Sequence, residues 1–280
     1  MFIELFIFLC GAALSITGSL TFWPVHQWYD FYIPIVLFIA GYVGGLFLIV
    51  WNVYWIIGKV ISLKKNREKP SRVARWMVMQ GLRFMSIHAL IKTEFRGAAK
   101  LPKNEKFVLV CNHRSKFDSF LLSYFLGKYD LAFITKESNM KIPLAKPLIL
   151  SMGYLAIDRG DKLQSLEVMK EATELVQTGF TCMGVFPEGT RQTETTLGEF
   201  HEGVFNIALH SGAPLVVMTC WGTDKVAKNF PWKITKVRLD VLCTLMPEDI
   251  EGKPAIEISN MIHEIMQDHI EMLKSKERLH

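Results

Sequence analysis

A histidine and an aspartate follow an apolar segment at a spacing that could support chemistry. The stretch KFVLVCNHRSKFDSFLL, residues 106–122, ends its apolar run at Asn112 and His113 and places Asp118 five residues later. Histidine titrates near neutral pH and can take a proton from an alcohol, while a carboxylate can orient its ring. The two side chains meet only if the chain folds back between them, as at a strand-to-helix turn. The alternative for Asp118 is a plain helix N-cap.

The same spacing recurs near the C-terminus, at His263 and Asp268 in MIHEIMQDHIEM. That segment has helical periodicity, and five residues along a helix turn a side chain by roughly 140°. We therefore expect this second pair to point to different sides of a surface helix. The spacing by itself predicts nothing, and the local structure must distinguish the two pairs.

A second polar cluster, FPEGTR, occupies residues 186–191 at the end of another apolar segment. A turn of this composition presents backbone N–H groups, the Thr190 hydroxyl and the Arg191 guanidinium together. Arginine offers a bidentate fork to phosphate, and Gly189 lets the backbone come close. The sequence thus suggests a phosphate site. The alternative is a surface turn in which Glu188 pairs with Arg191.

The elements that must position these clusters alternate between apolar strands and helices. Such alternation predicts an α/β layer structure with a largely parallel sheet, in which sites form beyond the carboxyl ends of strands. Both polar clusters follow predicted strands. The strands are expected at residues 106–111, 131–135, 154–158, 181–186, 214–220 and 236–246.

The N-terminal part of the chain has a different composition. The chain has 280 residues, is 50% hydrophobic, and concentrates its apolar residues in segments 1–23 and 31–63. Each segment is long enough to cross a bilayer, which takes about 20 residues. We expect two hydrophobic helices joined by the turn PVHQWYD. A hairpin that dips into one leaflet is the competing interpretation.

The charge distribution predicts an orientation. The connecting turn has no Lys or Arg, whereas KKNREKPSRVAR follows the second apolar segment. Basic residues favour the cytoplasmic side, so we expect the catalytic part to face the cytoplasm, with a bacterial cytoplasmic membrane as the location. The pattern of residues 71–91 predicts a basic amphipathic helix that lies on the membrane surface. No aromatic–basic platform for nucleic acid is present in the sequence.

Five scattered cysteines, at positions 10, 111, 182, 220 and 243, include no C-x-x-C pair. This pattern favours reduced thiols over disulfides or structural zinc. Cys111 lies two residues before His113 and could be taken for a nucleophile. A small apolar filler at a strand end is the favoured interpretation.

Taken together, NHRSKFD and FPEGTR resemble the motifs of the glycerolipid acyltransferases, in particular the PlsC-type 1-acylglycerol-3-phosphate acyltransferases. The segments ITKESNMKIPLAKPLI (134–149), GYLAIDRGD (153–161) and GAPLVVMTC (212–220) agree in order and spacing, so the resemblance covers residues 106–220. Two departures occur. Leu155-Ala156 stands where bulky aromatics are common in the family, and His201-Glu202 where a lysine is frequent.

The resemblance implies a glycerol-3-phosphate acyltransferase-like fold and transfer of an acyl group from a thioester to the sn-2 hydroxyl of lysophosphatidic acid. His113 would be the base and Asp118 its partner. The family motifs also imply a phosphate site formed by Glu188, Gly189, Thr190 and Arg191. Arg159 would be a second phosphate contact, or else part of a structural ion pair. Weaker candidates are Asn112, Ser115 and Lys136.

The expected co-substrate is acyl-CoA or acyl carrier protein, with direct attack, no acyl-enzyme, no bound cofactor and no metal. We divide the chain into a membrane hairpin at 1–63, an amphipathic helix and linker at 64–105, and a catalytic domain at 106–280. Other acceptors, such as glycerol-3-phosphate or another lysophospholipid, remain open. So do a metal-dependent membrane phosphoesterase and a non-catalytic lipid-binding relative.

Overall fold

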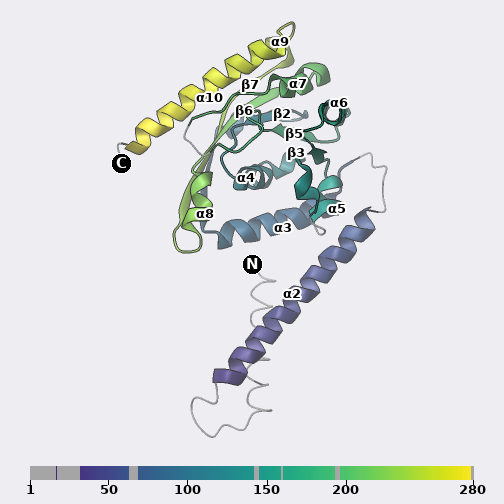
Figure 1. The fold of residues 1–280 in the computed structure, drawn as a ribbon, viewed down its shortest axis with the longest axis vertical. Coiled ribbons are helices and arrows are strands. Elements are labelled where there is room, and N and C mark those ends of the chain that lie inside the picture. Colours follow the sequence, from purple (N-terminus) through teal and green to yellow (C-terminus); the bar gives the residue numbers. More distant parts are fainter. Residues whose placement is uncertain are drawn as a thin grey trace. The chain divides into compact units, whose positions relative to one another are not determined.

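A computed structural model describes residue 17 and the ranges 32–62, 69–141, 145–158, 160–192 and 196–278. The chain divides into two compact units, Met1–Val60 and Ile61–His280. The first predicted apolar helix, at 1–23, falls outside the described residues apart from residue 17. Figure 1 shows the fold, coloured along the sequence.

The described part of the N-terminal unit is one long helix. Helix α2 runs from Tyr32 to Ser62 and contains no acidic residue in its first turn. Its window Val43–Ile61 has a mean hydropathy of 1.6 over 19 residues. By length and composition alone, this helix could cross a bilayer, which requires about 20 apolar residues.

Within the described residues of the second unit, seven strands form one sheet in the order β1-β7-β6-β2-β5-β3-β4. Every strand pair is parallel except β6 with β7, which are antiparallel. The expected largely parallel α/β fold is therefore confirmed. The strands are β1 Ile91–Arg96, β2 Val108–Cys111, β3 Leu131–Lys136, β4 Leu155–Ile157, β5 Cys182–Val185, β6 Leu215–Trp221 and β7 Thr235–Leu245.

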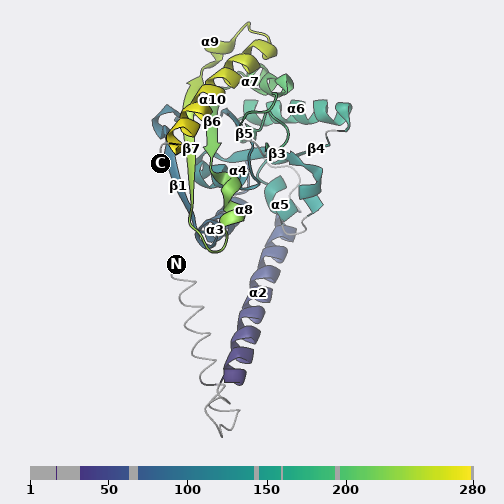
Figure 2. The same ribbon diagram turned by 60° about the vertical axis from the view of Figure 1, so that its left-hand side comes forward.

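Helices cover both faces of this sheet (Figures 1 and 2). One face packs against α4, and α3 lies beyond it; the other packs against α6, α7 and α10. The helix bounds are α3 Arg72–His88, α4 Phe117–Phe125, α5 Ala145–Leu150, α6 Lys162–Gln177, α7 Asn206–Ser211, α8 Val226–Asn229, α9 Pro247–Ile250 and α10 Ala255–Arg278.

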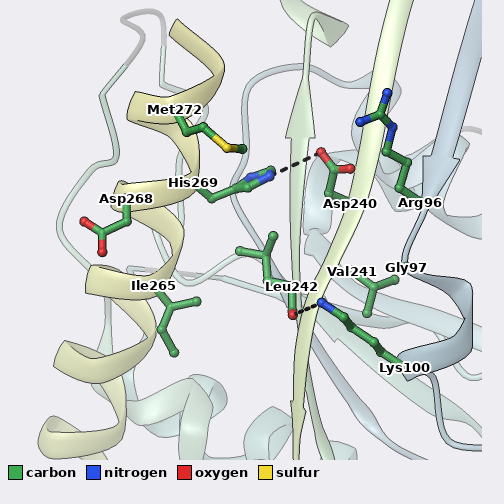
Figure 3. Close-up of a pocket in the computed structure, with 10 residues that line it drawn as sticks. All are labelled: Arg96, Gly97, Lys100, Asp240, Val241, Leu242, Ile265, Asp268, His269 and Met272. Carbon is green, nitrogen blue, oxygen red and sulfur yellow. Dashed lines mark hydrogen bonds and ion pairs between the residues drawn. The ribbon is translucent and has the colours of Figure 1, made fainter. Parts of the chain in front are cut away.

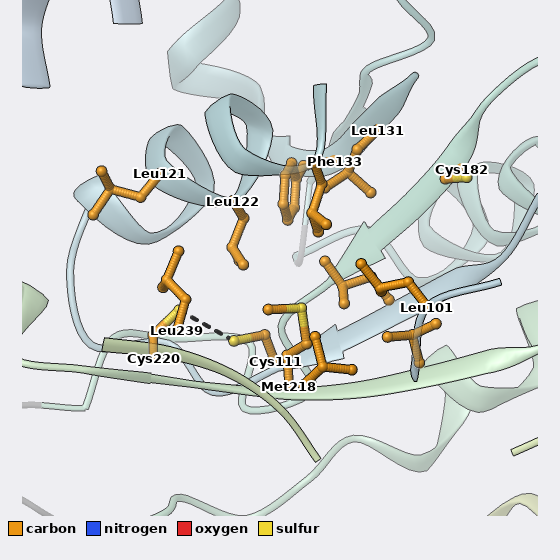
Figure 4. Packing of buried hydrophobic residues seen from close by; sticks show 14 of the residues in the cluster. Leu101, Cys111, Leu121, Leu122, Leu131, Phe133, Cys182, Met218, Cys220 and Leu239 are labelled. Atoms are coloured by element: carbon orange, nitrogen blue, oxygen red, sulfur yellow. Dashed lines mark hydrogen bonds between the residues drawn. The ribbon is translucent and has the colours of Figure 1, made fainter. Parts of the chain in front are cut away.

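The core beneath α4 also supports the edge of the sheet that carries the first motif. Leu121 and Leu122 of α4 are fully buried and pack in one cluster with residues of the central strands. Figure 4 shows Leu122 pointing toward Leu239, Cys111 and Met218. Because these side chains are buried between α4 and the sheet, they hold α4 in place beside the end of β2.

One strand was absent from the sequence-based expectation. Residues 91–96, which we assigned to the linker 64–105, form strand β1 and pair with β7 at the sheet edge. The segment IKTEFR alternates half-buried and exposed residues, and six residues of such weak amphipathicity resemble a loop. The preceding amphipathic helix does form, as α3, with Ser71 as its N-cap.

Candidate active site

The two polar motifs lie at the same edge of the sheet because the strands that precede them are neighbours. Strand β2 pairs in parallel with β5, with Val108 opposite Met183 and Val110 opposite Val185. Their carboxyl ends therefore emerge side by side, as binding sites in α/β sheets require. The chain leaves β2 into Asn112 and His113, and leaves β5 into the segment 186–191.

His113 and Asp118 are in direct contact. Nδ1 of His113 lies 2.9 Å from Oδ2 of Asp118, whose side chain is 0% exposed, while that of His113 is 17% exposed. Oδ2 also accepts the backbone N–H groups of Arg114 and Ser115, each at 2.7 Å. The turn before α4 thus fixes the carboxylate beneath the imidazole. Asp118 is not the N-cap, a position that Lys116 occupies.

This contact determines which ring nitrogen of His113 can act. When Nδ1–H donates to Asp118, the neutral ring keeps an unprotonated Nε2 with a free lone pair. The ring stacks on Phe186, with centroids 4.1 Å apart and planes 17° apart, and Phe186 stacks on Phe133 at 5.4 Å. The imidazole is therefore held in one orientation by a hydrogen bond and a column of rings.

Glu188 joins the two motifs. Its Oε1 accepts the backbone N–H of His113 at 2.9 Å, and its Oε2 accepts that of Gly198 at 3.1 Å. A third bond runs from the Gln192 N–H to the His113 carbonyl at 2.8 Å. Burial raises the pKa of Glu188, and the hydrogen bonds from His113 and Gly198 oppose that rise. Its contacts favour a positioning role over the expected contact with phosphate, which a carboxylate would repel.

The rest of the FPEGTR turn faces outward. Gly189 has φ +66°, a left-handed conformation that favours glycine, and its N–H donates to the Phe186 carbonyl at 3.0 Å. Thr190 and Arg191 are exposed. The alternative pairing of Glu188 with Arg191 does not occur among the described ion pairs.

Two of the weaker candidates, Asn112 and Ser115, have structural contacts. The Asn112 side chain bonds to both backbone groups of Cys220, accepting the N–H at 2.8 Å and donating to the carbonyl at 3.1 Å. The Ser115 hydroxyl accepts the Phe117 N–H at 3.3 Å. Lys136 is exposed at the end of β3. Arg159, the expected second phosphate contact, lies outside the described residues.

Sequence reasoning missed a role for Arg114. Its buried side chain forms an ion pair with Asp224, Nε to Oδ1 at 3.2 Å, and its guanidinium lies 5.0 Å from the centroid of the Trp221 ring. These contacts tie the motif loop to the end of β6. The only available signal was an arginine inside the H-x4-D loop, because its partners are about 110 residues away.

The second His–Asp pair behaves differently. His263 and Asp268 both belong to α10, and the His263 ring packs edge-on against Phe200 at 4.8 Å. Asp268 lines a pocket of about 510 Å³ between β7 and α10 (Figure 3). None of the motif residues lines this pocket. Equal spacing therefore gives contact at a strand-to-helix turn and no bond along a continuous helix.

Within that pocket, His269 is the central polar group. Its Nδ1 bonds to the Thr219 hydroxyl at 2.9 Å, and its Nε2 lies 3.6 Å from Asp240 (Figure 3). Burial lowers the pKa of His269, with Asp240 opposing the effect. Among the described residues, no three His, Cys, Asp or Glu side chains converge as metal ligands.

Comparisons with known proteins agree with this geometry. Residues 92–221 match the family model described as Acyltransferase. The chain is 32% identical to a chloroplastic 1-acyl-sn-glycerol-3-phosphate acyltransferase of Brassica napus, over 66% of this chain and 52% of the relative. It is 24% identical to the 1-acyl-sn-glycerol-3-phosphate acyltransferase of Haemophilus influenzae, over 80% of this chain and 92% of that protein. The alignment thus spans about half the length of the plant relative.

A solved structure shares the architecture. The 1-acyl-sn-glycerophosphate acyltransferase PlsC of Thermotoga maritima superposes with a TM-score of 0.60 and 25% identity, covering 81% of this chain and 93% of that one. The segment that matches the family model, residues 92–221, begins within β1 and ends with β6, so it includes both motif loops. Residues 92–221 therefore match the acyltransferase family model in sequence, and the chain shares its fold with the solved PlsC structure.

Proposed function

We propose that this protein transfers a fatty acyl group from an acyl thioester to the sn-2 hydroxyl of 1-acylglycerol-3-phosphate, giving phosphatidic acid. The observation that carries the proposal is the contact between His113 and Asp118, made at the sheet edge where the FPEGTR turn also emerges. The names of the similar proteins support the choice of acceptor.

The geometry suits general-base catalysis. Nε2 of His113 takes the proton of the acceptor hydroxyl while the hydroxyl oxygen attacks the thioester carbonyl. Asp118 stabilises the imidazolium through Nδ1. The tetrahedral intermediate collapses with cleavage of the carbon–sulfur bond, and the thiolate takes the proton back from Nε2. His113 is thereby regenerated as the neutral base.

The exposed part of the FPEGTR turn suits the acceptor's phosphate. Arg191 provides a charged fork, Thr190 a hydroxyl and Gly189 a close backbone approach. Arg159 is proposed as a second phosphate contact and Lys136 as a weaker one. Glu188 supports this site from behind, since both of its oxygens accept backbone N–H groups.

The reaction uses no protein nucleophile in this proposal. Cys111 is the nearest thiol in sequence, but it is fully buried, and burial raises the pKa of its thiol. Its sulfur lies 3.3 Å from that of Cys220. A thiol that resists ionisation attacks a thioester poorly, because the thiolate is the nucleophile.

The hydrophobic elements give the reaction its setting. We propose that α2 anchors the chain in a bacterial cytoplasmic membrane, with α3 on the cytoplasmic surface and the acceptor's acyl tail still in the bilayer. The donor is then a cytoplasmic thioester, either acyl-CoA or acyl carrier protein.

The test uses the full chain in detergent, given each donor with lysophosphatidic acid or glycerol-3-phosphate, with and without EDTA. We expect phosphatidic acid from lysophosphatidic acid, no effect of EDTA, and a large loss of product in His113→Ala. Full activity in His113→Ala would disprove the base assignment. If only glycerol-3-phosphate gave product, the acceptor would be glycerol-3-phosphate and not lysophosphatidic acid. Loss of activity in EDTA would favour metal-dependent chemistry.

A further inference from the structure

An exposed aromatic loop follows the strand that ends beside the motif loop. Residues 230–234, Phe-Pro-Trp-Lys-Ile, connect α8 to β7 and are called the FPWKI loop here. The side chains of Phe230, Trp232 and Ile234 are 52%, 88% and 66% exposed. Isolated exposed apolar residues are ordinary, but three within five residues form a patch of the kind that marks a binding surface.

The FPWKI loop continues into the outward side of α3. The Thr235 N–H donates to the Leu90 carbonyl at 2.9 Å, and the pairing of β1 with β7 begins at Ile91 and Thr235. Leu90 and Ile234 therefore precede neighbouring strands directly. Phe84 and Ile87, in the last turns of α3, are also exposed. Both ribbon views place α8 beside α3 (Figures 1 and 2).

This combined surface is basic. From Lys225 to Leu239 the chain has five Lys or Arg residues and no Asp or Glu, and residues 69–93 also contain no acidic residue. Two of the five, Lys225 and Arg238, pair with Glu277 and Asp240. Arg83, Lys228 and Lys233 are exposed and form no ion pair with another described residue. Their charge is therefore available to an anionic partner.

The surface also adjoins the candidate active site. Strands β2 and β6 are parallel, with Cys111 opposite Met218, so the chain leaves both at the same sheet edge. The segment that leaves β6 leads through α8 to the FPWKI loop. The stacked Arg114 and Trp221 join the start of that segment to the motif loop. A surface bound by this loop would therefore lie at the same end of the sheet as His113.

We propose that the FPWKI loop inserts into an anionic phospholipid bilayer and, with the C-terminal turns of α3, docks the His113 edge of the sheet on the membrane. Trp and Phe favour the headgroup region, and lysines beside them reach the anionic phosphates. Exposed apolar side chains beside unpaired cations suit an anionic bilayer. The inference rests on the proposed function for its use, which is access to a bilayer-borne acceptor.

Docking is measured by fluorescence, without any need for activity. Ile234→Cys and Ile256→Cys variants of the full chain, with Cys10 and Cys243 replaced by serine, are labelled with an environment-sensitive dye. They are then reconstituted in phosphatidylcholine vesicles with or without phosphatidylglycerol. Ile256 is a matched control, because it is an exposed isoleucine at the start of α10, beyond the opposite end of β7.

We expect the dye at position 234, but not at 256, to shift to the blue and to be quenched by lipids carrying a quencher in their upper acyl chain. Phosphatidylglycerol should strengthen both effects. An aqueous signal at 234 in every vesicle would overturn the proposal. A signal that stays aqueous in vesicles but shifts when an acidic protein such as acyl carrier protein is added would also overturn it, in favour of a protein partner.

A kinetic measurement links docking to the acceptor. The variant Trp232→Ser/Ile234→Ser should raise the apparent KM for lysophosphatidic acid in vesicles about tenfold, equivalent to about 1.4 kcal/mol. The same variant should leave the turnover of a short-chain, monomeric acceptor unchanged. The control variant Ile256→Ser should leave the kinetics with both acceptors unchanged. Equal loss with both acceptors would overturn the docking role. A dye that inserts in a protein with no acyltransfer activity would instead reject the proposed function and keep the docking.

Discussion

The backbone N–H of His113 donates a hydrogen bond of 2.9 Å to the carboxylate of Glu188, 75 residues further along the chain. The second oxygen of the same carboxylate holds the Gly198 N–H. One buried side chain therefore fixes the loop that holds His113 against the FPEGTR turn. Both halves of the proposed reaction depend on this link.

The first prediction compares the two His–Asp pairs of equal spacing. His113→Ala should lower kcat by about 10²–10⁴-fold, because no other group would take the hydroxyl proton. Asp118→Asn should lower kcat as well, since it disturbs the tautomer and leaves the imidazolium without its carboxylate. Steady-state kinetics of acyl transfer would measure both effects.

Variants His263→Ala and Asp268→Asn are the matched controls for that comparison. They lie on α10, outside the candidate site, and should retain activity close to that of the parent. If they lost as much activity as the motif variants, the distinction between the two pairs would be wrong.

The second prediction concerns the positioning role of Glu188. In Glu188→Gln, one side-chain oxygen becomes an NH₂ group and can no longer accept a backbone N–H. The free energy of unfolding should fall by about 1–3 kcal/mol, the cost of leaving a buried donor unpaired. Denaturant unfolding in detergent would measure it, with Glu202→Gln, an exposed glutamate, as control. An unchanged stability would show that the hydrogen bond lost in Glu188→Gln is not needed.

The third prediction is the pH dependence of the same comparison. Burial raises the folded-state pKa of Glu188 above its ordinary value of 4.5. The folded state then binds the proton more tightly than the unfolded state, so stability decreases as pH rises through the window above 4.5. The stability of the parent relative to Glu188→Gln should therefore fall from pH 4 towards neutrality. A difference that grows with pH would show that the hydrogen bonds outweigh burial.

The fourth prediction tests the ring column behind His113. A Cβ added at Gly184 would overlap the Phe133 ring, which stacks on Phe186 and through it supports the imidazole. Gly184→Ala should destabilise the fold by about 1–3 kcal/mol through overpacking and should also lower kcat. Thermal unfolding and kinetics on the same sample would show both effects.

Gly81→Ala is its control, because no atom lies within 4 Å of the Cβ position and the residue is in the interior of α3. That change should stabilise the fold by about 0.5–1 kcal/mol. An unchanged Gly184→Ala protein would mean that the ring column can shift without consequence for His113.

The fifth prediction separates phosphate recognition from chemistry. Arg191→Ala should raise the KM for lysophosphatidic acid roughly 10- to 100-fold, the range expected for losing a charged hydrogen bond of about 1.5–3 kcal/mol. The KM for the thioester donor should not change. Arg96→Ala, an exposed arginine paired with Glu94, is the control and should leave both constants unchanged. A fall in kcat at constant KM would place Arg191 in the chemical step instead.

The fold class and the order of its elements follow from local patterns in the sequence. Apolar segments of strand length alternate with amphipathic segments, and these local patterns do not depend on distant partners, so most strand bounds agree within two residues. Strand β1 was not predicted, because its six weakly amphipathic residues do not distinguish a strand from a loop and its pairing with β7 is a long-range contact. The motif residues were also recognisable, because their types and spacing are local properties.

The way in which those residues act together depends on long-range contacts in the folded chain. The bond between Nδ1 of His113 and Asp118 needs a strand-to-helix turn, whereas the same spacing on α10 gives no such bond. The positioning contacts of Glu188, Asn112 and Arg114 join residues 75 to 110 positions apart. Parallel strand pairing creates these contacts by bringing distant chain segments to one sheet edge. No local pattern encodes that pairing, so it appeared only in the folded chain.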